Sequence, residues 1–137
     1  MSDESTPTTR GRVTGLGGIF FKTRDPAASL AWYQQHLGLE PGPGFPGSVF
    51  KWQAEDGTPG ATIWSLFSSE TSCFGPPGGA DHMVNYRVDD LDALLAKLEA
   101  AGVVVLPQRE ASEFGRFAWI LDPDGHRIEL WEPPAGM

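Results

Sequence analysis

The sequence predicts an α+β fold made of two tandem strand–helix–strand–strand–strand units. Each half of the chain begins with an apolar strand that leads directly into a helix capped by aspartate. The spacing from cap to closing glycine is the same in both halves, 13 positions from Asp25 to Gly38 and 13 from Asp89 to Gly102. A repeated spacing of this kind indicates a duplicated module rather than one open sheet.

Composition limits the kinds of partner. The chain has 137 residues with a net charge of −8, and it contains no basic cluster, so nucleic acid and anionic membranes are not expected partners. No apolar run approaches the roughly 18 residues of a membrane span, and the polar N-terminus lacks a secretory signal. A single cysteine, Cys73, excludes an internal disulfide. We therefore expect a cytoplasmic protein.

The first module is expected at about residues 13–70, after a disordered polar tail at residues 1–12. A strand at residues 13–23 precedes a helix from Asp25 to Leu37, in which Asp25 is the N-cap and Pro26 occupies the first turn. Two further strands are expected at residues 48–54 and 61–67, and a third strand should complete the module.

A Pro/Gly-rich linker at residues 71–81 leads to the second module, at about residues 82–134, within one domain that spans residues 13–137. Its strand at residues 82–88 precedes a helix from Asp90 to Ala101. Leucines in that helix recur with helical spacing, at Leu91, Leu94, Leu95 and Leu98. A strand at residues 103–106 and a closing hairpin complete the unit.

The closing hairpin is the stretch around which the rest is organised. Residues 117–121 form an apolar strand, and the turn Asp122-Pro123-Asp124-Gly125 follows it. Residues 127–132 then alternate strictly, so Ile128 and Leu130 share one face, with Glu129 on the other. A carboxylate in mid-strand between aromatics is unusual. A solvated strand face is the alternative interpretation.

The sequence resembles the vicinal oxygen chelate superfamily, which includes glyoxalase I, extradiol dioxygenases, and fosfomycin- and bleomycin-resistance proteins. Three segments carry the resemblance and fall in both halves of the region at roughly residues 13–134: Phe20 to Leu39, Val88 to Leu95, and Asp122 to Leu130. The resemblance implies two βαβββ modules whose curved mixed sheet surrounds a cavity, with the helices outside. It also implies a homodimer and, in metal-using members, a divalent ion in the cavity.

The metal-ligand positions of the family fall on unsuitable residues in this chain. They correspond to Gly18, to the vicinity of Trp64, to Met83 and to Glu129, and only the last is a typical ligand. We therefore expect no metal cofactor, with a divalent metal as the alternative. His82 lies one residue from the expected position, so a bulge would be needed for it to join Glu129 as a ligand.

Residues that share a face with these positions are expected to line the cavity and bind a small molecule. Trp119 is added although its face cannot be fixed from the sequence. The predicted ligand-binding residues are Phe20, Lys22, Trp64, Met83, Asn85, Arg87, Trp119, Glu129 and Trp131. Aromatic walls with a few polar groups are typical of small-molecule pockets, although the same aromatics could simply fill a core.

Three functions remain open from the sequence. The first is a metal-free binder like the bleomycin-resistance branch, for which the negative net charge favours a cationic ligand. The second is an enzyme of the glyoxalase, isomerase or dioxygenase kind, in which Glu129 is the candidate general base and Lys22 or Arg87 stabilises an enolate. The third is an interaction module with a vestigial cavity.

Overall fold

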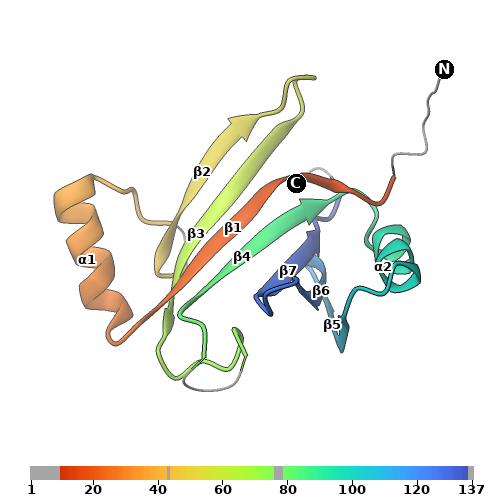
Figure 1. Cartoon of the computed structure of the whole chain (residues 1–137). Helices are drawn as coiled ribbons and strands as arrows, with labels where there is room; N and C mark the ends of the chain where they lie inside the picture. Colours follow the sequence, from red (N-terminus) through yellow and green to blue (C-terminus); the bar gives the residue numbers. More distant parts are fainter. Residues whose placement is uncertain (1–9, 43, 76–78, 136–137) are drawn as a thin grey trace. The chain divides into compact units, whose positions relative to one another are not determined.

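The computed structural model describes residues 10–42, 44–75 and 79–135 (Figure 1). Its elements are β1 (Val13–Thr23), α1 (Pro26–Leu37), β2 (Gly47–Gln53), β3 (Pro59–Ser68), β4 (His82–Val88), α2 (Leu91–Ala100), β5 (Val105–Ser112), β6 (Gly115–Leu121) and β7 (Arg127–Glu132). The seven strands belong to a mixed sheet, which confirms the α+β class. Within the described residues, α1 is followed by two strands before the second module, where three were expected.

The chain divides into two compact units. Of the described residues, those from 16 to 85 form the N-terminal unit, and those from 86 to 135 together with 10–15 form the C-terminal unit, so β1 and β4 each cross the boundary. The strand order is β2-β3-β1-β4 in the N-terminal unit and β4-β7-β6-β5 in the C-terminal unit. No helix in the described ranges has the length and apolar character of a membrane span.

Helix α1 of the N-terminal unit begins and ends as its sequence predicts. The side chain of Asp25 accepts a hydrogen bond from the N–H of Ala28 at 3.1 Å, and Gly38 ends the helix with φ +68°. The helix is only partly covered by the rest of the unit, because none of its residues is buried and Trp32 is 53% exposed. Tyr33 is the residue that meets β3, with its ring edge against Trp64.

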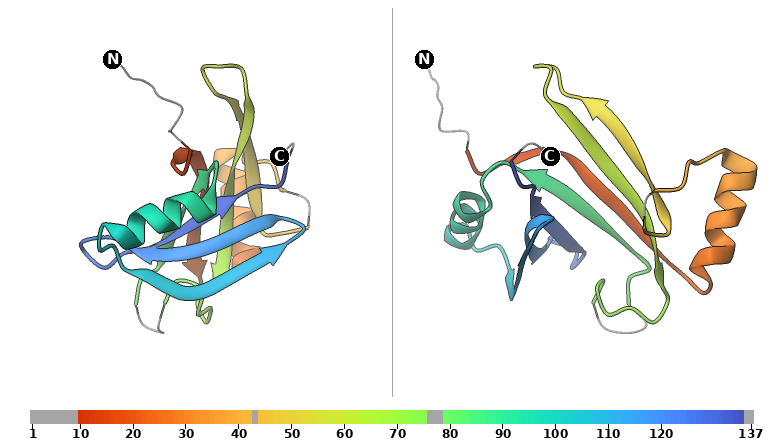
Figure 2. Two further views of the ribbon diagram at one scale, coloured as in Figure 1. Left: turned by 90° about the vertical axis from the view of Figure 1, so that its right-hand side faces the viewer. Right: turned by 180° about the vertical axis from the view of Figure 1, so that it is seen from behind.

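The core of the C-terminal unit lies between α2 and the sheet strands (Figure 2). Five buried side chains form it: Val88, Leu91, Leu95, Ala118 and Leu130. Ile120 and Ile128 pack against the same cluster. The even-numbered residues of β6 and β7 therefore face α2, and for β7 this is what the alternation at residues 127–132 predicts.

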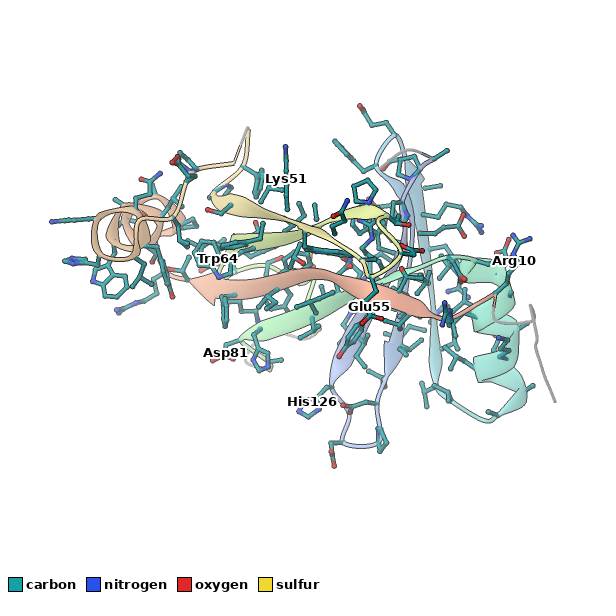
Figure 3. The ribbon with its side chains drawn as sticks, turned by 90° about the horizontal axis from the view of Figure 1, so that it is seen from above. Arg10, Lys51, Glu55, Trp64, Asp81 and His126 are labelled. Atoms are coloured by element: carbon teal, nitrogen blue, oxygen red, sulfur yellow. The ribbon has the colours of Figure 1, made fainter. Side chains whose placement is uncertain are left out.

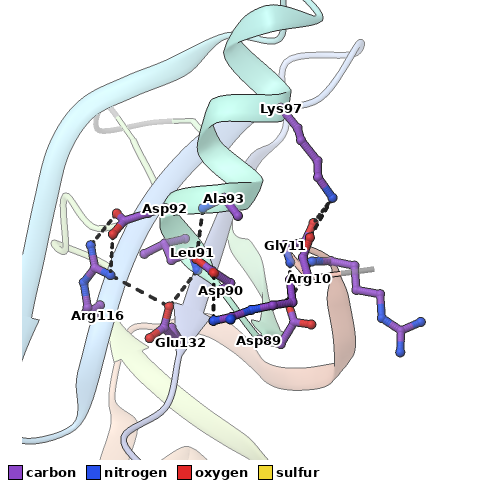
Figure 4. Close-up of polar contacts among 11 residues, drawn as sticks. Arg10, Gly11, Asp89, Asp90, Leu91, Asp92, Ala93, Lys97, Arg116 and Glu132 are labelled. Carbon is purple, nitrogen blue, oxygen red and sulfur yellow. Dashed lines mark hydrogen bonds and ion pairs between the residues drawn. The ribbon is translucent and has the colours of Figure 1, made fainter. Parts of the chain in front are cut away.

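The two aspartates before α2 have different partners (Figure 4). Asp90 caps the helix by accepting from the N–H of Ala93 at 3.0 Å, whereas Asp89 accepts from the N–H groups of Gly11 and Arg12 at 2.7 and 2.9 Å. Burial raises the pKa of Asp89, but these backbone bonds outweigh it and the pKa is lowered overall. Residues 10–12 of the expected tail are thus held against α2, and residues 1–9 lie outside the described residues.

Candidate functional site

The face of the C-terminal unit opposite α2 carries an unusual set of charged and aromatic side chains. Strands β6 and β7 pair with Trp119 opposite Glu129 and Phe117 opposite Trp131, and directly paired residues point to the same side of a sheet. Arg87 of β4 joins this side, since its guanidinium lies 5.3 Å from the Trp131 ring centre. We call this set the Glu129 face: Arg87, Phe117, Trp119, Arg127, Glu129 and Trp131.

Glu129 is half-buried and held in a defined orientation. The indole Nε1–H of Trp119 donates to its Oε2 at 3.0 Å, across the β6–β7 pair. A charge-assisted bond of this kind fixes one carboxylate oxygen, and it contributes roughly 1.5–3 kcal/mol when it is shielded from water. The solvated-face interpretation of Glu129 therefore does not describe this side chain.

The ring of each tryptophan on the Glu129 face makes a cation–π contact with an arginine. The guanidinium of Arg127 lies 5.6 Å from the Trp119 ring centre, and Arg87 covers Trp131. Trp131 is further fixed by stacking on Phe117, with 6.2 Å between ring centres and 7° between planes, and by donating to the carbonyl of Phe114 at 2.7 Å. Burial lowers the pKa of Arg87, but an arginine stays protonated at neutral pH.

Arg127 has one unsatisfied donor. Its Nε is buried and has no hydrogen-bond partner among the described residues. An unmade hydrogen bond at a buried donor costs about 1–3 kcal/mol, so such groups are usually satisfied by a ligand or an ordered water. Arg127 therefore marks one point on the Glu129 face where a ligand acceptor would be favoured.

The other predicted ligand-binding residues lie in the N-terminal unit. Met83 and Asn85 are both 2% exposed and lie two residues apart on β4, so they share one face of the strand, and Phe20 is buried on β1. The ring of Phe20 lies 5.3 Å from that of Phe67, and Lys22 lies 5.6 Å from the ring centre of Phe74. Because the two units are described separately, a cavity that includes both sets stays a prediction.

Trp64 does not share a face with Phe20 and Lys22, and on this point the sequence analysis was wrong. The parallel β1–β3 register pairs Trp64 with Ile19 and Phe20 with Ser65, so Trp64 points to the opposite side of the sheet. Its ring instead lies toward α1, 4.6 Å from that of Tyr33 (Figure 3). Alternation along one strand does not give the offset between two strands, and an offset of one residue reverses the face.

Four residues next to the predicted ones were missed. Ser65 and Phe67 share the side of Phe20 and Lys22 through the β1–β3 register. Phe74 lies in the segment assigned to the linker, which is why its contact with Phe67, 5.2 Å between ring centres, was not foreseen. Phe117 could have been found, because it lies two residues before Trp119 on one strand and must share its face.

The positions that hold a metal in the family do not supply a donor set here. A side chain at Gly18 would meet the ring of Phe20 at 2.7 Å, so an aromatic ring occupies the space of the first ligand. Trp64 points to the other side of the sheet, and Met83 offers only a thioether. His82 lies on the strand next to Met83 and hydrogen-bonds to Asp81 at 3.0 Å. The expected absence of a metal remains a prediction, to be checked by elemental analysis.

Three side chains of a type that can bind a metal ion lie close together in a turn, and the hydrogen bonds of the turn explain why they do. The ligand atoms of Asp122, Asp124 and His126 lie within 4.8 Å of one another at the tip of the β6–β7 hairpin (Figure 3). Asp122 already accepts from the N–H groups of Asp124 and His126 at 2.9 and 2.8 Å, and His126 Nδ1 lies 2.7 Å from its Oδ2. These contacts close the turn between the two strands, so the cluster has a structural explanation.

The Asp122–His126 pair predicts a pH dependence. Its hydrogen bond raises the pKa of His126 and lowers that of Asp122. The stabilisation from His126 is fully present below its unfolded pKa and is lost as pH rises through the folded pKa. The stabilisation from Asp122 is present above the pKa of Asp122 in the unfolded chain, and it is lost as pH falls through the pKa of Asp122 in the folded protein. The pair therefore stabilises the turn most from about pH 4 to 6.5.

The substitution Asp122→Asn should bring the pKa of His126 back toward its ordinary value, as measured by NMR titration of the imidazole protons. Asp124→Asn is the matched control, since Asp124 acts on His126 only through longer-range attraction and should change this pKa less. Equal shifts in the two variants would contradict the assigned contact.

A hollow of about 430 Å³ lies elsewhere in the C-terminal unit, at the end of α2. Its lining is mostly aliphatic and includes Leu98, Val104, Ile120 and Ile128. Ile120 and Ile128 belong to the α2 side of the sheet, so this hollow lies on the side opposite Glu129. None of the predicted ligand-binding residues lines it.

Comparison with known proteins gives a consistent result. The sequence model of the Glyoxalase/Bleomycin resistance protein/Dioxygenase superfamily matches residues 15–130. No curated protein matches the chain. The chain is similar to the solved structure of Streptomyces coelicolor methylmalonyl-CoA epimerase, with TM-score 0.67 and 22% identity over 90% of this chain and 100% of that one.

Two further solved structures have the same fold. Methylmalonyl-CoA epimerase from Mycobacterium tuberculosis gives TM-score 0.57 and 22% identity, over 94% of this chain and 93% of that one. A glyoxalase/bleomycin resistance protein/dioxygenase superfamily member from Vibrio splendidus 12B01 gives 0.53 and 15%, over 85% and 98%. At these identities the likeness shows a shared fold and does not assign a reaction.

Proposed function

The chain belongs to the glyoxalase/bleomycin resistance protein/dioxygenase superfamily, and we propose that it binds a small organic molecule on the Glu129 face. The observation that carries the proposal is the half-buried carboxylate of Glu129, which Trp119 holds by one oxygen. A carboxylate fixed beside an aromatic ring is suited to accept a hydrogen bond from a ligand hydroxyl or amine. The ligand's apolar part would pack against Trp119.

The rigidity of the face supports binding. Trp131 is fixed by a stacked ring, a backbone hydrogen bond and a guanidinium, so little side-chain freedom remains to be lost when a ligand arrives. Side chains that only fill a core need no charged groups, yet this face has three in Arg87, Arg127 and Glu129. The expected homodimer and cytoplasmic location stay predictions of the sequence.

The test uses para-hydroxybenzamide, a neutral probe with an aromatic ring and a hydroxyl donor. Binding is followed by NMR through the indole N–H resonance of Trp119, assigned with a Trp119→Phe variant. Glu129→Gln should weaken binding by roughly 1.5–3 kcal/mol, because Trp119 keeps the amide oxygen and the amide NH2 group cannot accept the hydrogen bond from the probe hydroxyl. The fold should be retained, since the amide oxygen can still accept from Trp119.

Glu99→Gln is the matched control, because it removes the same charge from an exposed position on α2. It should leave the affinity unchanged. If the probe binds the Glu129→Gln variant as tightly as the parent, Glu129 is an ordinary strand residue and the proposal is wrong.

A second candidate is an enzyme in which Glu129 removes a proton next to a carbonyl group. Two guanidinium groups on the same face, from Arg87 and Arg127, favour it because they could stabilise the resulting enolate. The two candidates differ in one measurable property. Only an enzyme of this kind would accelerate exchange of the methyl protons of pyruvate for deuterium in D₂O, and Glu129→Gln would abolish that acceleration.

A further inference from the structure

We infer that the ligand of the Glu129 face is a small carboxylate, and that its carboxylate accepts hydrogen bonds from Arg127. The inference rests on the proposed function and names the class of molecule that the face would take.

Arg127 differs from Arg116 and Arg10, two arginines of the same unit that form ion pairs. Arg116, on the adjacent strand, pairs with Asp92 at 2.6 Å, and Arg10 pairs with Asp90 at 3.1 Å. Among the described residues, no ion pair includes Arg127, although it is half-buried and its Nε is shielded from solvent. A cation held in this way favours an external anion as its partner.

The neighbouring carboxylates have other partners. Glu129 accepts from Trp119, and Asp122 accepts from His126 and from two backbone N–H groups of its turn. Glu110 of β5 is exposed and stands opposite Phe117, four residues along β6 from the partner of Arg127. That separation is roughly 13 Å along a strand. The acceptor missing at Arg127 is thus best supplied by a ligand.

The geometry of Arg127 suits a carboxylate in particular. Its guanidinium carbon lies 5.6 Å from the Trp119 ring centre, and a cation–π contact of this kind uses none of the N–H donors. Donors arranged in one plane match the two oxygens of a carboxylate, which accept two parallel hydrogen bonds. Glu129, two residues along β7, would accept from a hydroxyl or amine of the same molecule.

The negative charge of the whole chain does not oppose this inference. Its net charge of −8 by itself favours a cationic ligand. Exposed charges act over only about 8 Å at physiological ionic strength, whereas Arg127 would be in direct contact with the ligand. The local guanidinium therefore decides which charge the ligand carries at this point.

The experiment compares three probes with the same ring and hydroxyl: para-hydroxybenzoate, para-hydroxybenzamide and para-hydroxybenzamidine. They carry a carboxylate, a neutral amide and a cationic amidinium in the same place. Titrations follow the indole N–H resonance of Trp119 in the full chain. The carboxylate should bind about tenfold more tightly than the amide, and the amidinium should bind most weakly.

Arg127→Met should remove the preference for the carboxylate, so that the carboxylate and the amide bind this variant within about twofold of each other, because neither probe then meets a guanidinium while the methionine stem still covers Trp119. Arg127→Lys should restore part of the preference, since it keeps the charge and loses the planar donors. Arg109→Met is the matched control. It removes an exposed arginine from the other side of the sheet, where its residue pairs with Ala118, and should change nothing.

The outcomes separate this inference from the proposed function. If the amide or the amidinium binds as tightly as the carboxylate, or if Arg127→Met keeps the carboxylate preference, the inference is wrong and the proposed function stands. If none of the three probes shifts the Trp119 resonance at millimolar concentration, the proposed function is wrong and the inference falls with it.

Discussion

Replacing Leu91 with alanine should lower the free energy of unfolding by roughly 3–5 kcal/mol. Leu91 is only 1% exposed and packs with Val88, Leu95, Ala118 and Leu130 in the core of the C-terminal unit. It is also the first residue of α2, and its N–H donates to Oε1 of Glu132 at 2.7 Å. The helix is therefore anchored at the position that would become a cavity, which limits its ability to move inward and fill the space.

Chemical denaturation followed by tryptophan fluorescence measures this loss. Leu94→Ala is the matched control, since Leu94 lies in the same helix but is only partly buried, and its loss should be about 1–2 kcal/mol. Equal losses in the two variants would contradict the assigned core. Because Leu91 and Glu129 lie on opposite sides of the sheet, folded Leu91→Ala protein should have the same affinity for para-hydroxybenzamide as the parent protein.

The parts of the fold that depend on local chemistry could be predicted from the sequence. Asp25 and Pro26 start α1 because a side-chain cap and a fixed φ favour a helix at that point, and the structure confirms both. The α2 side of the closing hairpin follows from strict alternation at Ile128 and Leu130. These signals act within a few residues, so no knowledge of distant contacts is needed.

The relation between strands that are distant in sequence could not be predicted. Trp64 was placed with Phe20 because each strand was read correctly by itself, but the parallel β1–β3 register offsets them by one residue. The contact of Arg87 with Trp131 likewise joins β4 and β7. These strands are far apart in the sequence, because 38 residues, α2 among them, lie between Val88 and Arg127. Nothing local to either residue indicates that contact.

The hairpin at the candidate site is an intermediate case. Its turn at residues 122–126 fixes the pairing of Leu121 with Arg127, and from there the pairing of Trp119 with Glu129 follows by counting back along both strands. The position of Arg127 over Trp119 then requires only that diagonal neighbours on one face can touch. The hydrogen bond between Trp119 and Glu129 could therefore have been predicted by this counting, although the strand pattern alone does not fix the face on which Trp119 lies.

Gly115→Ala should be nearly as damaging as the loss of Leu91, for a different reason. Gly115 follows the β5–β6 turn and has φ +115°, a backbone conformation that residues other than glycine rarely adopt. An added Cβ would lie 2.4 Å from the backbone oxygen of Glu132 and 2.9 Å from Nε1 of Trp131. Backbone strain and overpacking together predict a loss of roughly 2–6 kcal/mol in the free energy of unfolding.

Gly115→Ala should also alter the position of the Trp131 ring on the Glu129 face. Trp131 donates to the carbonyl of Phe114, the residue before Gly115, so moving this strand end disturbs the bond that fixes the ring beneath Arg87. The indole N–H resonance of Trp131 should shift in folded Gly115→Ala protein. Gly125→Ala is the control, because Gly125 has φ +84° but open space around its Cβ position, so only about 1–2 kcal/mol of strain is expected there. Equal losses in the two variants would mean that backbone conformation alone, and not the close approach of β7, makes glycine necessary at position 115.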